Sequence, residues 1–156
     1  MLPKYCTDRV VEIAQNLAGA DAADAGSGLN VFPASNTANT LTLKNVLLAA
    51  NKKGWLAGMD AAAIAALPSA NCGLTGNGIP VVSDGTSLSS DTSCSTWLND
   101  TTDKNGVDPL IDVLADNGGP TQTHKLLAGS PALGAGTADA TIKVDQRGTT
   151  RDAYAR

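Results

Sequence analysis

The chain has 156 residues, a formal net charge of −4 and a pI of about 4.7. This acidic balance argues against a nucleic-acid-binding protein, because phosphate groups require a basic face. No apolar run approaches the roughly 20 residues that a membrane span needs. Aromatic residues make up only 3% of the chain, and Gly, Asn, Asp, Thr and Ser dominate its polar positions. The length suits one domain, and the composition favours turns and strands over helices.

The N-terminal residues have the pattern of a short helix over 7–18. Thr7 or Asp8 can cap this helix, and Gly19 can end it. Its apolar residues have helical spacing, namely Val10, Val11, Ile13, Ala14 and Leu17. We therefore expect residues 1–20 to form a capping helix that covers an open sheet edge, or else a helix docked on the side. The first six residues are not followed by the apolar segment of a secretory signal, so any export information lies outside this sequence.

Residues 40–51 give the clearest strand pattern, and a helical pattern follows them. Leu41 and Leu43 alternate inward, Asn45 shifts the phase, and Val46 and Leu48 continue the apolar face. A helical insertion is expected at about 56–67, because Asp60 can cap an alanine-rich run that ends before Pro68. Insertions of this kind can carry a binding face, although a plain decoration of the fold is the preferred interpretation.

Residues 101–112, TTDKNGVDPLID, partly imitate a calcium-binding loop. Asp103, Asn105 and Asp112 occupy the third, fifth and twelfth places of such a loop. The first place is a threonine and the last ligand is aspartate instead of glutamate, so an ordinary turn is favoured. These three residues remain the best calcium candidate in the sequence, and no other cofactor is expected.

Residues 116–136 read as a turn, a short strand, a second turn and a small-residue strand, which is typical of one rung of a solenoid. The stretch LADNGGPTQTH at 114–124, followed by DQRG at 145–148, closely resembles the C-terminal signature of choice-of-anchor Q domain bacterial surface proteins. The resemblance extends from residue 40 to residue 148, with a gap at the insertion. After residue 148 the closing motif of that family is missing.

The resemblance implies an all-β fold, a right-handed parallel β-helix (solenoid) related to pectate lyases, over residues 27–156. With the segments above, this gives a solenoid that carries an N-terminal helix and a helical insertion. The resemblance also implies a secreted or cell-surface location in a bacterium. Asn45 would face inward and bond the backbone of a neighbouring turn. The remaining signature residues would have structural roles, namely Asn117, Gly118, Gly119, Pro120, Thr121, Thr123 and His124.

The three cysteines are Cys6, Cys72 and Cys94. The family pattern around the last two implies a disulfide between Cys72 and Cys94, which would close a loop of about 20 residues and contribute roughly 3 kcal/mol. Such a bond would place the protein in an oxidising compartment. The alternative is a pair of free buried thiols in a cytosolic protein. Cys6 has no evident partner.

The sequence favours a non-enzymatic structural or adhesion module that contacts surface glycans or other copies of itself, with an open C-terminal rung available for association. A Ser-His-Asp device would need His124, the only histidine, which the signature explains structurally. One alternative is a polysaccharide lyase or hydrolase that uses paired carboxylates. Another is a calcium-stabilised spacer. The aspartates lie at positions typical of turns, which favours neither the enzyme nor the calcium-stabilised spacer.

Overall fold

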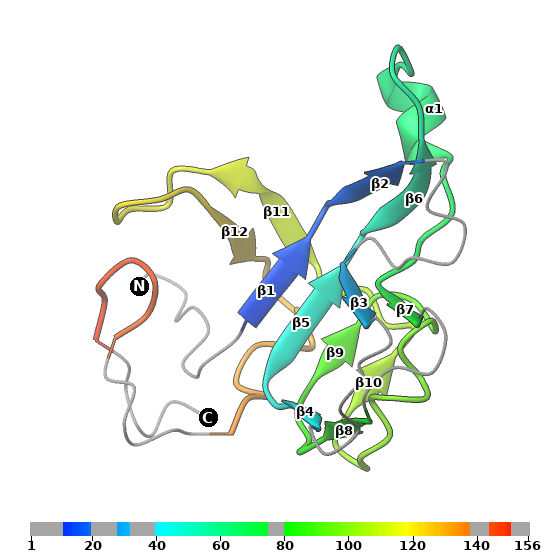
Figure 1. The fold of residues 1–156 in the computed structure, drawn as a ribbon. Coiled ribbons are helices and arrows are strands. Elements are labelled where there is room, and N and C mark those ends of the chain that lie inside the picture. The colour runs from blue at the N-terminus through cyan, green and yellow to red at the C-terminus, as the bar shows by residue number, and fades with distance from the viewer. Residues whose placement is uncertain (1–10, 20–27, 32–39, 75–79, 138–143, 151–156) are drawn as a thin grey trace.

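The computed structural model describes residues 11–19, 28–31, 40–74, 80–137 and 144–150, and these form short β-strands and one short helix (Figure 1). The strands are β1 (Val11–Ala14), β2 (Leu17–Gly19), β3 (Leu29–Val31), β4 (Leu41–Leu43), β5 (Val46–Ala49), β6 (Lys52–Trp55), β7 (Cys72–Leu74), β8 (Val81–Ser83), β9 (Leu88–Ser89), β10 (Lys104–Asn105), β11 (Ile111–Ala115) and β12 (Thr123–Leu126). The helix is α1 (Ala61–Ala65). None of the described helical residues forms a segment long and apolar enough to cross a membrane.

The strands pair into five small sheets within the described residues. The central sheet has the order β1-β5-β9-β10 and is parallel throughout. Three two-stranded sheets are also parallel, namely β2-β6, β3-β7 and β4-β8. The fifth, β11-β12, is antiparallel and extends to one side of the body in Figure 1.

Strand β5 lies between two cores, because its side chains are buried on both faces. Val46 and Leu48 belong to a first cluster that also contains Cys72, Cys94 and Trp97. On the opposite face Leu47 and Ala49 pack with Leu126 of β12. A strand with a continuous apolar run is the pattern expected for a parallel sheet covered on both sides.

The prediction of a right-handed parallel β-helix is wrong. The described strands are two to five residues long and belong to five separate sheets, one of them antiparallel. The chain interval between partners is also uneven, since Val11 pairs with Val46, Leu47 with Leu88, and Leu88 with Lys104. Short strands bounded by turns are compatible with both arrangements, so their local pattern cannot decide how the strands pair.

The N-terminal capping helix is also a wrong prediction. Residues 11–14 and 17–19 are strands β1 and β2, while residues 7–10 lie outside the described residues. Each residue of β1 has a partner on β5, and Ile13 packs against the first core cluster. Gln15 has a φ of 56°, which ends the strand before β2. Apolar spacing over so few residues fits both structures, and the tertiary partner decides between them.

The helix α1 lies inside the expected insertion but is only five residues long. Asp60 is its N-cap, with a side-chain oxygen 2.8 Å from the amide nitrogen of Ala63. The helix has no buried residue and lies at the tip of an arm beyond β2 and β6 (Figure 1).

Candidate functional site

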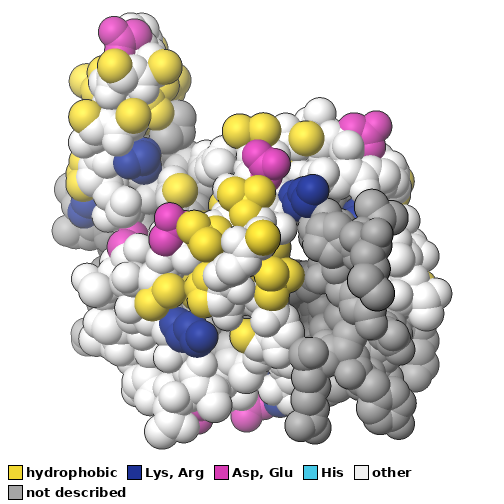
Figure 2. All heavy atoms as spheres, turned by 180° about the vertical axis from the view of Figure 1, so that it is seen from behind, with side chains coloured by type: hydrophobic (Ala, Val, Ile, Leu, Met, Phe, Trp, Pro, Cys, Tyr) yellow, Lys and Arg dark blue, Asp and Glu magenta, His cyan; other side chains and the backbone are white. Residues whose placement is uncertain are grey.

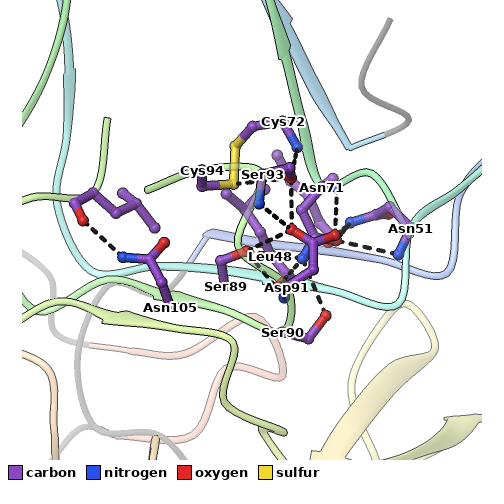
Figure 3. The surroundings of a disulfide bond; sticks show 12 residues. Leu48, Asn51, Asn71, Cys72, Ser89, Ser90, Asp91, Ser93, Cys94 and Asn105 are labelled. Atoms are coloured by element: carbon purple, nitrogen blue, oxygen red, sulfur yellow. Dashed lines mark hydrogen bonds between the residues drawn. A yellow bond between two sulfur atoms is a disulfide. The ribbon is translucent and has the colours of Figure 1, made fainter. Parts of the chain in front are cut away.

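A disulfide joins the beginning of β7 to the turn that follows β9. The bond links Cys72 to Cys94, as the sequence predicted, and their Cα atoms lie 5.1 Å apart. Cys94 is fully buried, and both cysteines pack in the first core cluster beside Leu48 and Trp97. Figure 3 shows that polar side chains surround this bond on one side.

Asn71 is the centre of that polar group. It is fully buried, and its Nδ2 donates to the carbonyl oxygen of Leu48 at 3.0 Å and to the hydroxyls of Ser89 and Ser90 at 2.9 and 3.0 Å. Its Oδ1 accepts from the backbone amide and the Nδ2 of Asn51 at 3.2 and 2.9 Å. One amide therefore connects the ends of β5 and β9 with the start of β6.

Asn51 extends the same network towards the N-terminus. Its Nδ2 also donates to the carbonyl oxygen of Ile13 at 2.8 Å, and its Oδ1 accepts from the backbone and side chain of Asn16 at 3.0 and 2.9 Å. Gly28 lies against these two asparagines, because a Cβ atom there would be 2.7 Å from Asn51 Nδ2 and from Asn71 O. Glycine is therefore required at that close approach.

Asp91 and Ser93 complete the network next to the disulfide. Asp91 Oδ2 accepts from the backbone amide of Asn71 at 3.0 Å, and its Oδ1 accepts from the amide and the hydroxyl of Ser93. The Ser93 hydroxyl in turn accepts from the amide of Cys72 at 2.9 Å. The polar atoms of these side chains form hydrogen bonds with one another, as is typical of a buried structural network.

The calcium candidates are engaged in separate local contacts. Asp103 uses both carboxylate oxygens, which accept from the amides of Ser87 and Asp100 at 2.9 and 3.0 Å. Asn105 donates to the carbonyl oxygen of Leu98, and Asp112 accepts from the amide of its neighbour. No group of three or more metal-binding side chains occurs in the described part of the chain. The calcium site therefore stays a prediction.

The turn at 116–120 forms a second structural unit with the DQRG segment. Asn117 Nδ2 donates to the carbonyl oxygen of Thr123 at 2.7 Å and closes the turn between β11 and β12. Gly119 has a φ of 96°, and a Cβ atom there would be 2.5 Å from the Cα of Arg147. Gln146 Nε2 donates to the hydroxyl of Thr121 at 2.6 Å. The two signature segments therefore pack against each other.

Asp145 bonds to its neighbours within and next to the DQRG segment. Its carboxylate forms an ion pair with Arg147, with a distance of 2.6 Å between the charged atoms, and accepts from the amides of Arg147 and Thr149. Burial raises the pKa of Asp145, but hydrogen bonds from these two residues and the charge of Arg147 outweigh it and hold the pKa below its usual range. The ionised form of Asp145 therefore stabilises the folded structure.

His124 and Ser130 bond to backbone carbonyls and not to each other. His124 Nδ1 lies 2.7 Å from the carbonyl oxygen of Asp112, at the bulge of the β11-β12 pair. A carbonyl can only accept, so this contact assigns the proton to Nδ1. The Ser130 hydroxyl donates to the carbonyl oxygen of Pro109. This arrangement is not that of a serine nucleophile with its base.

Asn45 holds a distant segment against β5. Its Nδ2 and Oδ1 bond to the carbonyl and amide of Thr137 at 2.9 and 2.8 Å. A shallow pocket of about 20 Å³, room for about one water molecule, lies beside it with Leu47 and Leu88 in its lining and Lys104 contributing a cation.

No family model, curated protein or solved structure matches the chain. The sequence did not predict the network of Asn51, Asn71, Asp91 and Ser93, although the family pattern around Cys72 and Cys94 implied their disulfide. An asparagine beside a strand was the available signal, since Asn51 follows β5 and Asn71 precedes β7. The side-chain partners of Asn51 and Asn71 lie 18 or more residues away, where local patterns give no information.

Proposed function

We propose that this chain is a non-enzymatic structural and adhesion module of a secreted or cell-surface protein. The observation that carries the proposal is the Cys72–Cys94 disulfide, which is buried in the apolar core and flanked on one side by a network of polar side chains. Disulfides persist in oxidising compartments and are rare in the cytosol. The resemblance of residues 114–124 and 145–148 to bacterial surface proteins supports the same location.

The engagement of the polar groups supports a structural role. Asp91 and Asp103 use both carboxylate oxygens in hydrogen bonds within the chain. The hydroxyl of Thr102 similarly binds Asp100 and lowers the pKa of that carboxylate. A general acid or base must instead present its carboxylate or ring nitrogen to a substrate.

Exposed apolar side chains on the surface could contact glycans or another copy of the chain. Hydrophobic side chains gather in the middle of the face shown in Figure 2. Exposed apolar residues occur on β11, directly after β12 and beside the DQRG segment, namely Val113, Leu114, Leu127 and Val144. Exposed apolar side chains that gather in a contiguous patch often mark an interaction site.

The location is tested by intact-mass analysis of the protein after alkylation without reductant. We expect a single modified thiol, that of Cys6, because Cys72 and Cys94 are bonded. Alkylation after reduction under denaturing conditions is the matched control and should modify all three cysteines. Three modified thiols in the unreduced protein would contradict the oxidising location.

The adhesion role is tested separately on a glycan array. Binding to surface glycans without the release of reducing ends would support the proposal. Release of reducing or unsaturated ends from any polysaccharide would show an enzyme and overturn the non-enzymatic assignment. If the array shows no binding, the glycan is excluded as the partner and another copy of the chain remains.

A further inference from the structure

A pocket lies between the central sheet and the segment of residues 131–136. Leu47, Leu88 and Lys104 are paired in register on β5, β9 and β10, so their side chains form one row on the same face of the sheet. All three residues line the pocket. Small residues of the segment line it as well, namely Pro131, Ala132, Ala135 and Gly136. The pocket is therefore largely apolar and has a cation in its lining.

Hydrogen bonds at both ends hold this segment against the sheet. At one end the amide group of Asn45 bonds to the backbone carbonyl and the backbone amide of Thr137, at 2.9 and 2.8 Å. At the other end the hydroxyl of Ser130 donates to a backbone carbonyl and accepts from the amide of Ala132. The walls of the pocket are therefore formed before any ligand arrives, which lowers the cost of binding.

The size and the lining of the pocket suit a methyl group better than a water molecule. Its volume is about 20 Å³, enough for one group of that size. All three hydroxyls in the lining already donate to acceptors of the chain, namely those of Thr86, Ser87 and Thr102. These hydroxyls therefore offer no donor to a water molecule, which needs several polar partners. A methyl group instead gains free energy by leaving water for the apolar side chains around it.

Lys104 supplies the positive charge at this pocket. Its side chain is exposed, and among the described residues its ammonium group has no hydrogen-bond or ion-pair partner. Asp103, the adjacent residue, directs both carboxylate oxygens to the backbone amides of Ser87 and Asp100. The ammonium group of Lys104 is therefore available to an anionic group of a ligand, and a charge-assisted hydrogen bond of this kind is stronger than a neutral one.

We propose that this pocket binds an acidic sugar that carries an acetyl group. The methyl of the acetyl group occupies the apolar hole, and the carboxylate of the sugar accepts a hydrogen bond from Lys104. The inference rests on the part of the proposed function that names surface glycans as partners, and it assigns that contact to one site and to one class of sugar. A sugar with only the acetyl group or only the carboxylate uses half of the site and should bind more weakly.

The binding test uses sugars that separate these two groups. N-acetylneuraminic acid and N-acetylmuramic acid carry both a carboxylate and an acetyl group, glucuronic acid carries only the carboxylate, and N-acetylglucosamine carries only the acetyl group. In titrations followed by amide NMR, we expect the first two to shift the amides of Leu88, Lys104 and Ala135. The other two should need concentrations about fivefold higher. A preference between the two acids distinguishes a sialylated glycan from a cell-wall glycan as the source.

Substitutions at the two parts of the pocket test the assignment. Lys104→Gln removes the cation and should weaken the binding of both acetylated acids about fivefold. Lys53→Gln makes the same change of charge on β6, outside the pocket, and should leave binding unchanged. Ala135→Leu fills the hole from an exposed position and should abolish the preference for acetylated acids over glucuronic acid. Circular dichroism checks that each variant retains the fold.

Equal binding of acetylated acids and the two simpler sugars would overturn the proposal, as would shifts confined to amides outside the pocket or no binding of either acetylated acid. An equal loss of binding in Lys53→Gln and Lys104→Gln would also overturn it. The glycan array then separates this failure from that of the proposed function. Binding to other glycans would leave the adhesion role in place, whereas an array without any binding would remove the glycan contact as well.

Discussion

The region of residues 40–107 and the region of residues 108–150 use the same polar residue types for different purposes. In the first, Asn71 bonds to Leu48 and Ser89, 23 and 18 residues away. In the second, Asn117 bonds to Thr123, six residues away, and Asp145 bonds to Arg147, two residues away. The first region is therefore held by contacts between distant segments, and much of the second by turns that organise themselves.

Burial follows the same division. Asn71 and Cys94 have no exposed surface, whereas Val113 and Leu114 on β11 are 68% and 52% exposed. An isolated two-stranded sheet is marginal in water, so β11-β12 depends on its contact with β5 through Leu126. The comparison predicts that substitutions cost most in the first region and become milder towards the DQRG segment.

The largest effect is expected for Asn71→Ala. The substitution leaves the buried backbone N–H of Asn51 without its acceptor and removes one of the two donors to the carbonyl of Leu48, which keeps the amide of Ser90. These losses should lower the free energy of unfolding by about 3 kcal/mol. The matched substitution in the second region, Asn117→Ala, removes a half-buried side chain and should cost about 1 kcal/mol. Urea unfolding measures both. Equal losses would show that the two regions do not differ in this way.

A smaller effect is expected for Gly119→Ala, and Gly118→Ala is its control. Both glycines have a positive φ, of 96° and 87°, so both substitutions strain the backbone by about 1 kcal/mol. A Cβ atom at Gly119 would also collide with Arg147, whereas none of the described atoms lies within 4 Å of one at Gly118. We expect Gly119→Ala to cost about 1 kcal/mol more than its control. Equal melting temperatures would mean that the two signature segments do not pack together.

The smallest effect is expected for the charge of Asp145. Its pKa in the folded protein is lowered from 3.8, so the ionised form stabilises the fold above that value. This contribution is lost as the pH falls through the lowered pKa. Asp145→Asn should therefore melt below the unmodified protein at neutral pH, and the difference should shrink in acid below about pH 4. A difference that stays constant as the pH falls would exclude this ion pair as its source.

The sequence by itself determined the features that depend on a few neighbouring residues. Asp60 caps the helix that follows it, and glycines with a positive φ occupy the turn at 117–120. Resemblance to a family pattern added the Cys72–Cys94 pairing, which the structure confirms. Each of these features is encoded within a turn or within a recognisable motif.

Only the tertiary structure decided which distant segments meet. Residues 11–19 had the spacing of a helix, but β5 and β6 provide partners that make them strands. The turn-rich pattern predicted a solenoid, while the strands pair into five small sheets. Asn51 and Asn71 each lie beside a strand, but local patterns did not indicate their network, because the side-chain atoms of these asparagines bond to residues 18 or more positions away. Backbone propensity acts over a few residues, whereas strand pairing and the burial of an amide depend on the partner that the whole chain brings to it.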